Sequence, residues 1–196
     1  MMIAIIDYEM GNLRSVGNAL DRLGAEWKLT SDPEEIRRAS RVLLPGVGND
    51  AEAMMRLRER GLCEVIRDLR RPVLGICVGM QVMCRHSEEG DVDCLGIFDA
   101  KVRHFPDEEG LKIPHVGWNS INNLESKLFK GIERGAYVYY VHSYYAPLCP
   151  DTIATTHYGS TMFSAALKYE NFYGTQFHPE KSGDVGEQIL KRFLEL

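Results

Sequence analysis

Apolar residues along the first 80 positions alternate between short continuous runs and longer runs with helical spacing. Continuous runs are typical of strands buried on both faces, and apolar residues repeated every three or four positions are typical of helices with one buried face. Strands are expected at residues 3–7, 26–30, 41–44 and 73–76, and helices at residues 13–23, from 33 onward, at 50–60 and up to 69. This alternation predicts a parallel sheet covered by helices on both faces.

The second half of the chain has shorter apolar runs separated by more turns. Strands are expected at residues 97–105, 120–122, 137–141, 153–156, 163–167 and 172–177, and a terminal helix at residues 183–196. Several of these strands are expected to pair antiparallel. The predicted fold is α/β, with a mostly parallel central sheet flanked by helices and a smaller antiparallel side sheet, in one domain over residues 1–196.

Composition and charge argue against several classes of function. The 196 residues are 44% hydrophobic and 26% charged, which is typical of a soluble domain. A net charge of -5 argues against a surface for nucleic acid or anionic membranes, and the apolar stretch at residues 1–6 is too short to span a bilayer. Five cysteines without Cys-x-x-Cys spacing indicate reduced thiols in a cytoplasmic protein. They give no spacing signal for zinc, so neither a metal nor a cofactor is expected.

One apolar run ends on a cysteine that stands between two glycines. Cys77 follows Gly75, precedes Gly79 and opens a helix-like segment. This is the pattern of a nucleophile elbow, a sharp strand-to-helix turn in which larger neighbours would collide with the backbone. The N-terminus of the helix would favour the thiolate form of Cys77. Taken alone, a cysteine at the end of a strand is more often a small buried hydrophobic residue.

A histidine and a carboxylate near the C-terminus supply a second part of the same chemistry. In His178-Pro179-Glu180, proline favours an extended conformation at His178, and residues two apart in an extended chain point to the same side. Glu180 is therefore expected to hold one imidazole nitrogen while the other nitrogen faces a thiol. This motif alone would indicate a solvated turn. Together with the elbow, it indicates a cysteine nucleophile and its base.

These two motifs, residues 75–81 and 178–180, resemble those of the triad-type class I glutamine amidotransferases, which implies a flavodoxin-like fold. Further stretches resemble the glutaminase subunits of imidazole glycerol phosphate synthases, so that the resemblance spans nearly the whole chain. These stretches are Asp7–Leu13, Pro45–Gly48, Pro114–Asn119, Tyr140–Tyr144 and Phe177–Ser182. Three residues depart from the usual pattern: Glu9 replaces a glycine, Val78 a leucine and Val116 a methionine.

The resemblance implies that Cys77 attacks the side-chain amide of L-glutamine, that His178 transfers the proton and that Glu180 orients His178. The tetrahedral oxyanion needs backbone N–H donors, which we assign to Val78 and to the loop of Val47 and Gly48. Gln81 lies one helical turn after the nucleophile, on the same face. The residues that the resemblance implies for glutamine binding are Gln81, Glu89, Ser143 and Tyr144.

Residues 46–51 also match the Gly-x-Gly-x-x-Gly/Ala fingerprint of dinucleotide-binding proteins. Their context does not fit that function, because the motif follows a proline and the third expected strand, and no acidic residue ends the next strand. We therefore expect this loop to serve the oxyanion and not a nucleotide.

The released ammonia needs an acceptor, and the chain has no Walker loop or second domain that would supply one. The resemblance implies a heterodimer with the cyclase subunit of imidazole glycerol phosphate synthase, a (β/α)-barrel of histidine biosynthesis. Trp118 and Asn12 are the contacts implied for this partner. Trp118 is expected in a loop, with its ring buried at the interface or in its own domain. Three alternatives stay open: a free-standing γ-glutamyl cysteine hydrolase, a glutaminase subunit of another two-component amidotransferase, and a regulatory module without turnover.

Overall fold

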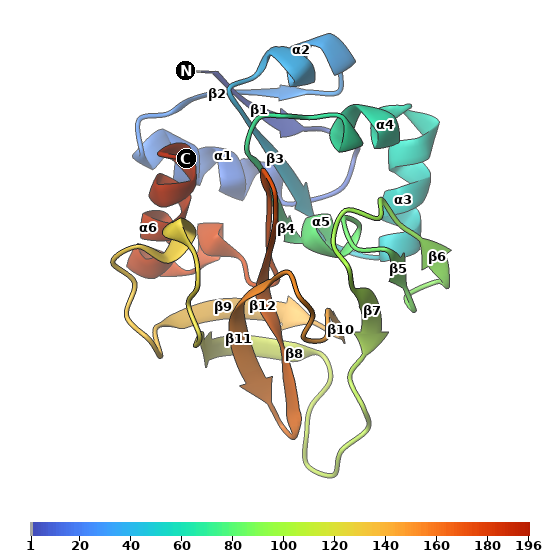
Figure 1. The fold of residues 1–196 in the computed structure, drawn as a ribbon, viewed down its shortest axis with the longest axis vertical. Helices are drawn as coiled ribbons and strands as arrows, with labels where there is room; N and C mark the ends of the chain where they lie inside the picture. The colour runs from blue at the N-terminus through green and yellow to red at the C-terminus, as the bar shows by residue number, and fades with distance from the viewer. Residues whose placement is uncertain (1) are drawn as a thin grey trace.

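The computed structural model describes residues 2–196, and within them it contains three β-sheets. The largest consists of β1 (Met2–Ile6), β2 (Glu26–Thr30), β3 (Arg41–Gly46), β4 (Val73–Cys77), β11 (Thr152–Tyr158), β12 (Thr161–Tyr169) and β13 (Phe172–Thr175). Its strand order is β11-β12-β13-β4-β3-β1-β2 (Figure 1). The five strands from β13 to β2 are parallel, and β12 and β11 continue the sheet antiparallel at one edge.

At least one helix follows each of the five parallel strands in the chain. The helices are α1 (Leu13–Arg22), α2 (Pro33–Arg38), α3 (Asp50–Glu59), α4 (Leu62–Arg67), α5 (Val78–Gln81) and α6 (Gly183–Leu194), with short 3-10 turns η1 (Lys127–Phe129) and η2 (Pro179–Lys181). Helices α1 and α6 lie on one side of the sheet, and α3 and α4 lie on the other (Figure 1). The start of α2 is the predicted one, because the Asp32 side chain accepts from the backbone N–H groups of Glu34 and Glu35.

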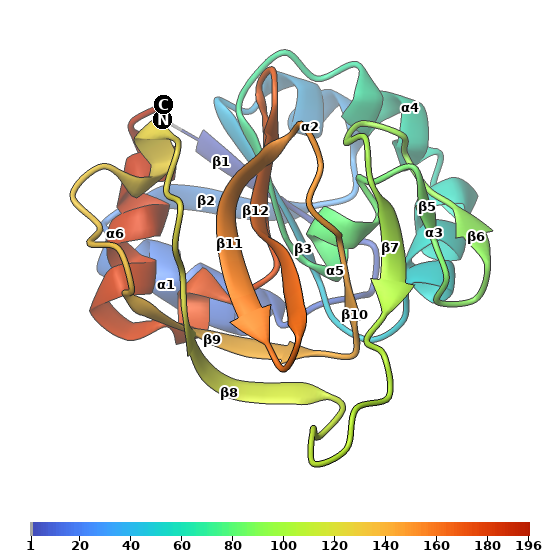
Figure 2. The same ribbon diagram turned by 60° about the horizontal axis from the view of Figure 1, so that its bottom comes forward.

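Two smaller sheets complete the fold. One is four-stranded, with β5 (His86–Ser87), β6 (Val92–Asp93), β7 (Lys101–His104) and β10 (Tyr144–Tyr145). The other is an antiparallel ribbon of β8 (His115–Ser120) and β9 (Tyr137–His142), which runs crosswise to β11 and β12 in Figure 1. Figure 2 shows β8 at the lower edge of the view. The predicted α/β fold with a mostly parallel central sheet and a smaller antiparallel part is therefore confirmed.

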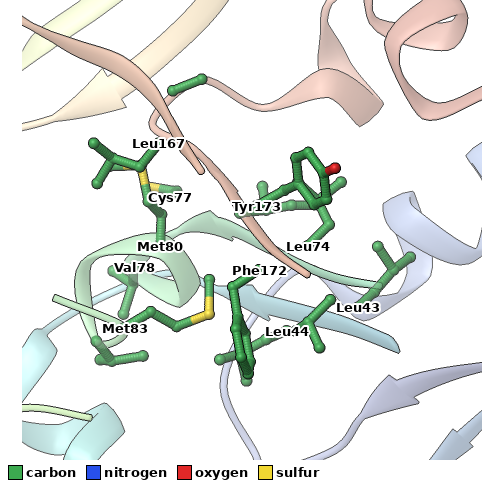
Figure 3. Packing of buried hydrophobic residues seen from close by; sticks show 14 of the residues in the cluster. Leu43, Leu44, Leu74, Cys77, Val78, Met80, Met83, Leu167, Phe172 and Tyr173 are labelled. Carbon is green, nitrogen blue, oxygen red and sulfur yellow. The ribbon is translucent and has the colours of Figure 1, made fainter. Parts of the chain in front are cut away.

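Strand β4 lies at the centre of the buried core, between β3 and β13. Figure 3 shows side chains from all three strands packed beside α5. Leu43 of β3, Leu74 of β4 and Phe172 of β13 are at most 4% exposed. The Met80 side chain packs over Gly174 of β13, and the Met83 side chain packs against Gly75 of β4. The end of β4, where the cysteine lies, is thus held by apolar packing on both sides.

The structure differs from the expectations in the second half of the chain. Only Lys101–His104 of the strand expected at 97–105 is extended into a sheet, because the N–H groups of Ile97 and Phe98 both bond to the Met83 carbonyl. The strand expected at 120–122 is wrong: the strand is β8, which ends at Ser120, and Asn122 makes only an isolated bridge to Thr155. The two-residue strands β5, β6 and β10 were not expected, since two residues carry no periodicity.

Trp118 lies inside β8, so the expectation that it lies in a loop is wrong. Strand β8 was missed because its buried face consists of a histidine, a glycine and an asparagine, which give no alternating apolar pattern. Its pairing with β9 is nevertheless continuous over six residue pairs, including Trp118 with Tyr139. The partner strand, and not the local sequence, defines this element.

Candidate active site

Cys77 stands at a strained turn between β4 and α5. Its backbone angles are φ 55° and ψ -112°, which few residues other than glycine adopt. A Cβ atom on Gly79 would lie 1.8 Å from the Leu44 carbonyl oxygen, and one on Gly75 would lie 2.6 Å from the Gly79 carbonyl oxygen. The two glycines are therefore required for the close approach of β3, β4 and α5. This confirms the geometry predicted for the elbow.

His178 and Glu180 are paired as expected, but by a different backbone geometry. His178 Nδ1 and Glu180 Oε1 are 2.8 Å apart, and the two side chains are 1% and 2% exposed. His178 is extended, with ψ 97°, whereas Pro179–Lys181 form the 3-10 turn η2. The carboxylate is brought back to the imidazole by this turn and not by a continuous extended chain. The expectation of an extended segment through Glu180 is wrong in that respect.

The backbone of His178 is held by strand β9. The His178 N–H donates to the Tyr139 carbonyl oxygen at 2.9 Å. The buried Ser182 hydroxyl donates to the His178 carbonyl oxygen at 2.6 Å and accepts from the Tyr139 N–H at 3.0 Å. Ser182 thus closes a ring of hydrogen bonds around the base, a role that was not foreseen from the sequence. Its place at the end of the His178 motif was the only signal.

The electrostatic state of His178 is set by competing effects. Burial lowers its pKa, but the negative charge and hydrogen-bonding contact of Cys77, together with the Glu180 carboxylate, outweigh burial and raise the pKa to about 10. Among residues 2–196, no atom meets hydrogen-bond geometry with His178 Nε2, although the Cys77 sulfur lies near enough to raise the pKa of the ring. Glu180 on the opposite nitrogen holds the imidazole in its orientation.

Two further groups contact the Cys77 sulfur. Gln176 Nε2 donates to Sγ at 3.7 Å, and the Sγ–H group is 3.9 Å from the Val141 carbonyl oxygen of β9. Gln176 is fully buried and was not among the expected site residues. A signal was present, because Gln176 lies in the strand expected at 172–177 and His178 follows it in an expected extended conformation, so that the two side chains face the same side. The sulfur of Cys77, in the first half of the chain, is consequently in contact with two residues of the second half.

A cavity of about 230 Å³ opens beside Cys77. This is smaller than the roughly 300–1,000 Å³ of sites for drug-sized ligands, and its size is appropriate for a small metabolite. Its walls are formed by Val47, Gly48, Cys77, Val78, Gln81, Glu89, Pro114, Val141, His142, Ser143, Tyr144 and His178. The structure therefore brings together every expected catalytic, oxyanion and glutamine-binding residue except Glu180, which lies behind His178.

Gln81 and Glu89 also bond to the protein around this cavity. Gln81 Nε2 donates to the Tyr144 carbonyl oxygen at 2.9 Å and to Gln176 Oε1 at 3.0 Å, so both amide hydrogens are engaged. Glu89 Oε2 accepts from the Asp50 N–H at 2.8 Å. Burial raises the pKa of Glu89. These bonds fix where each side chain meets the cavity.

The two residues expected at a partner interface lie in different surroundings. Trp118 is 54% exposed and contacts Tyr139 with an edge-to-face ring geometry at 6.0 Å. Asn12 is half-buried, and its side chain accepts from the Ser15 N–H at the start of α1. Exposure of Trp118 removes the alternative that its ring is buried in its own domain. The interface role of both residues stays a prediction.

Across residues 2–196, no helix has the length and apolar character needed to cross a bilayer. The same part of the chain contains no group of three or more metal-ligating side chains.

Comparison with known proteins places this site in a family. The model of the glutamine amidotransferase class-I family matches residues 4–196. The imidazole glycerol phosphate synthase subunit HisH of Bacteroides fragilis strain YCH46 is 56% identical, and the match covers 100% of both chains. The HisH subunit of Idiomarina loihiensis is 47% identical over 100% of this chain and 98% of its own length. The chain belongs to the class I glutamine amidotransferase family and, within it, to the HisH subunits of imidazole glycerol phosphate synthase.

Solved structures support the fold alone. A crystal structure of a glutamine amidotransferase superposes with a TM-score of 0.75 at 18% identity, covering 98% of this chain and 97% of that chain. The structure of PurLQS from Thermotoga maritima superposes with a TM-score of 0.74 at 16% identity, covering 99% and 97%. At these identities, only the architecture is transferred.

Proposed function

We propose that this chain hydrolyses L-glutamine to L-glutamate and ammonia, with Cys77, His178 and Glu180 as the catalytic triad of one glutamine amidotransferase domain over residues 1–196. One observation carries the proposal. His178 is buried with Nδ1 bonded to Glu180, while Nε2 has no partner of its own and lies beside the Cys77 sulfur. A base that is oriented on one nitrogen and free on the other is what nucleophilic catalysis by a thiol requires.

The reaction proceeds in two halves. The Cys77 thiolate attacks the side-chain amide carbon of glutamine, so that a C–S bond forms and an electron pair moves onto the oxygen. The His178 imidazolium gives its Nε2 proton to the amide nitrogen, the C–N bond breaks and ammonia leaves. Water then attacks the thioester and gives a proton to His178, and the C–S bond breaks to release glutamate. Glu180 stabilises the imidazolium throughout.

Two backbone segments serve the oxyanion. The Val78 N–H begins α5 directly after the nucleophile, and the loop of Val47 and Gly48 lies on the wall of the same cavity. Gly48 has φ +100°, a conformation that few other residues adopt. We assign the second donor to this loop and propose that rotation of its peptide completes the oxyanion hole.

The remaining wall residues bind glutamine. Because both amide hydrogens of Gln81 are engaged within the protein, Gln81 contributes its Oε1 as an acceptor. Glu89 supplies negative charge for the substrate ammonium group. The backbone of Ser143 and Tyr144 lies on the wall of the cavity and bonds the substrate carboxylate.

The partner follows from the relatives. The HisH proteins are named as subunits of imidazole glycerol phosphate synthase, so we propose that this chain passes ammonia to the cyclase subunit of that enzyme in the cytoplasm. The cyclase uses the nitrogen to form imidazole glycerol phosphate and an aminoimidazole carboxamide ribonucleotide. The exposed Trp118 supports docking at the β8–β9 ribbon, and Asn12 is proposed as a second contact.

The experiment that tests the proposal is covalent labelling with a chloroketone analogue of glutamine. Cys77 should be alkylated, glutamine should protect it, and Cys77→Ser should lose both labelling and glutamine hydrolysis, because a hydroxyl is a weaker nucleophile. Cys63→Ser is the matched control, since Cys63 is a half-buried free cysteine outside the cavity. Labelling of Cys63 or Cys149 with Cys77 untouched would rule out the assignment.

The partner is tested by titration against the cyclase subunit. Trp118→Ala should weaken association by about 2 kcal/mol, roughly thirtyfold, or uncouple ammonia release from product formation. Tyr169→Ala is the control, because Tyr169 is similarly exposed but lies at the opposite end of the main sheet. Equal affinity and equal stoichiometry for Trp118→Ala and wild type would place the docking site elsewhere.

A further inference from the structure

The β8–β9 ribbon has two different faces. The residue pairs alternate, so that Val116, Trp118 and Tyr137 point outward and are 56%, 54% and 60% exposed. We call this side, with the half-buried Tyr139 and Val141, the outer face. The other side points inward. It carries two buried histidines, His115 and His142, which are directly paired across the two strands.

The two histidines belong to a continuous chain of hydrogen bonds. His142 Nδ1 is 2.7 Å from the Tyr144 carbonyl oxygen, and His142 Nε2 is 3.0 Å from His115 Nδ1. His115 Nε2 is in turn 3.3 Å from Asn119 Nδ2. We call these four groups the histidine relay: Asn119, His115, His142 and the Tyr144 carbonyl. It begins in β8 and ends at the wall of the glutamine cavity.

The direction of every bond in the histidine relay is fixed by chemistry. The Tyr144 carbonyl only accepts, so His142 Nδ1 carries the proton and Nε2 of the neutral ring accepts. His115 Nδ1 must then donate, which leaves His115 Nε2 to accept from the Asn119 amide. Asn119 is oriented independently, because its Oδ1 accepts from the Ser120 N–H. The Tyr144 carbonyl at one end and the Asn119 amide at the other therefore require the same placement of the protons on the two histidines.

Burial keeps this arrangement neutral. The His115 ring is stacked between Tyr158 and Tyr140, with ring centroids 3.9 and 4.8 Å away. Burial lowers the pKa of His115 to about 4, and burial with its neighbours lowers the pKa of His142 to about 3. A fully satisfied polar network in a buried site favours one arrangement over others.

The Tyr144 carbonyl is where the histidine relay meets the catalytic residues. It accepts both from His142 and from Gln81, and Gln81 also bonds to Gln176, which contacts the Cys77 sulfur. A carbonyl with two lone pairs bonded to buried side chains cannot rotate without breaking one of them. We call Ser143 and Tyr144 the substrate-binding loop, and its position therefore depends on the position of His142.

The backbone of the same ribbon contacts the triad. The Tyr139 carbonyl accepts from the His178 N–H, and the Val141 carbonyl faces the Cys77 sulfur. One antiparallel ribbon thus presents its outer face to solvent, its backbone to the nucleophile and base, and its inner histidines to the substrate-binding loop. A partner that displaces the ribbon by binding its outer face therefore also displaces the groups that contact the nucleophile, the base and the substrate-binding loop.

We propose that His115 and His142 are positioning residues, which hold the Tyr144 carbonyl through the histidine relay and couple the outer face of the ribbon to the glutamine cavity. The inference rests on the proposed function in one respect, that a cyclase subunit docks on the outer face. Neither histidine takes part in the chemistry of the reaction. Docking changes glutamine turnover because the ribbon and the substrate-binding loop move as one unit.

The test uses two substitutions of His115 whose effects on packing and on hydrogen bonding are opposite. His115→Phe fills the aromatic site but has no donor for His142. His115→Asn leaves a cavity, but its amide can replace Nδ1 as the donor. A role in packing alone predicts that His115→Phe retains more activity than His115→Asn. The histidine relay predicts the reverse order.

The measurement is kcat/KM for glutamine, for the isolated chain and for its complex with the cyclase subunit, together with the melting temperature of each variant. We expect His115→Phe to lower the stimulation by the cyclase about tenfold and His115→Asn to keep it within about threefold of wild type, despite a lower melting temperature. The exposed His157→Phe should match wild type. The His142 imidazole N–H resonance should shift when the cyclase binds wild type and should not shift in His115→Phe.

Each outcome separates the histidine relay from the proposed function. If wild type hydrolyses glutamine and responds to the cyclase, but stimulation in the variants follows melting temperature, the histidine relay is overturned and the proposed function stands. An unshifted His142 resonance in the stimulated complex has the same meaning. If wild type neither hydrolyses glutamine nor binds the cyclase, the proposed function fails, and the coupling fails with it.

Discussion

The nucleophile and the base of the candidate site are held in position in different ways. Cys77 is placed by steric contact, since Gly75 and Gly79 allow backbone segments to approach to distances that no side chain permits. His178 is placed by hydrogen bonds: its N–H donates to the Tyr139 carbonyl oxygen, and its carbonyl oxygen accepts from the Ser182 hydroxyl. We call the surroundings of Cys77, which are formed by the parallel sheet, the steric side of the site. We call the surroundings of His178, which include the β8–β9 ribbon, the hydrogen-bonded side.

This difference has consequences for regulation and for tolerance to substitution. A steric contact between backbones has no alternative arrangement, so the nucleophile side is expected to be rigid. A hydrogen bond typically contributes about 1 kcal/mol and can be exchanged for another. The base side and the substrate-binding loop are therefore the parts that a docking partner can adjust. Substitutions on the two sides should therefore differ in how much they change activity and unfolding free energy.

The largest effect is expected at the base. His178→Ala should lower kcat for glutamine hydrolysis on the order of 10^4-fold, because proton transfer to the leaving nitrogen is lost. Glu180→Gln should also lower kcat, but its loss should be about tenfold to a hundredfold smaller than the loss in His178→Ala. The reason is that an amide can still hold the imidazole but stabilises the imidazolium poorly. Steady-state ammonia release checks both. Two small and equal losses would contradict the triad.

A large loss of stability is expected on the steric side. Gly79→Ala would place a Cβ atom 1.8 Å from the Leu44 carbonyl, so we expect a loss of about 3 kcal/mol or more in unfolding free energy. Gly61→Ala is the matched control: Gly61 has φ +64° but nothing within 4 Å, so only the backbone term of about 1 kcal/mol applies. Urea unfolding distinguishes them. Equal urea midpoints for the two variants would show that the backbone around the elbow shifts to accommodate the added methyl group.

The same division explains what the sequence could reveal. Gly75, Cys77 and Gly79 form a local pattern, because the elbow needs glycine on both sides of the nucleophile, although the Leu44 carbonyl that excludes a side chain at Gly79 belongs to β3. The parallel strands were likewise predictable, since strands buried on both faces are continuous apolar runs. Strand β8 was not, because its inward side carries the buried His115 and the half-buried Asn119, which are satisfied only by partners elsewhere in the fold.

The candidate site shows the same limit. The pairing of His178 with Glu180 was predictable from a three-residue motif, although the turn that produces it was not. Gln176 and Ser182 were missed because their partners, Cys77 and Tyr139, are 99 and 43 residues away in the chain. The spacing of two residues places Gln176 on the same side as His178, but it does not identify the distant partner, which depends on which strands become neighbours.

A third prediction concerns the loss of stability at low pH, which should arise first from the buried histidines of the hydrogen-bonded side. The pKa values of His115 and His142 are lowered by burial to about 4 and about 3, from an ordinary value near 6.5. Below pH 6.5 the unfolded chain binds protons that the folded chain does not. These histidines therefore add stability above pH 6.5, and each loses about 1.4 kcal/mol per pH unit as the pH falls.

Unfolding free energies from pH 7.5 to 4.5 check this expectation. His115→Phe should lose stability less steeply than wild type, by about 1.4 kcal/mol per pH unit below 6.5. The exposed His157→Phe should keep the steep wild-type slope. His178, which faces His142, has a raised pKa of about 10, so its contribution is present below pH 6.5 and is lost toward alkaline pH. Parallel curves for wild type and His115→Phe would show that His115 is charged in the folded chain.

The smallest effect is expected at Glu9, where ion pairs of the side chain offset an unfavourable backbone conformation. Glu9 stands where the resemblance led us to expect a glycine, and its backbone has φ 65°, which favours glycine. Its carboxylate is 2.8 Å from Arg56 Nη1 and 2.5 Å from Arg60 Nη2. Because the Glu9 side chain is 55% exposed, we expect these ion pairs to contribute no more than about 1 kcal/mol.

Two substitutions separate the backbone strain at Glu9 from its ion pairs. Glu9→Gln keeps the strained backbone and loses the charge, and should lower the unfolding free energy by up to about 1 kcal/mol at low salt. Glu9→Gly loses the same charge but relieves the left-handed backbone, and should be about 1 kcal/mol more stable than Glu9→Gln. High salt should bring wild type and Glu9→Gln together, because it screens the ion pairs. If Glu9→Gly proves less stable than Glu9→Gln in both salt conditions, the greater freedom of glycine in the unfolded chain outweighs the strain at this turn.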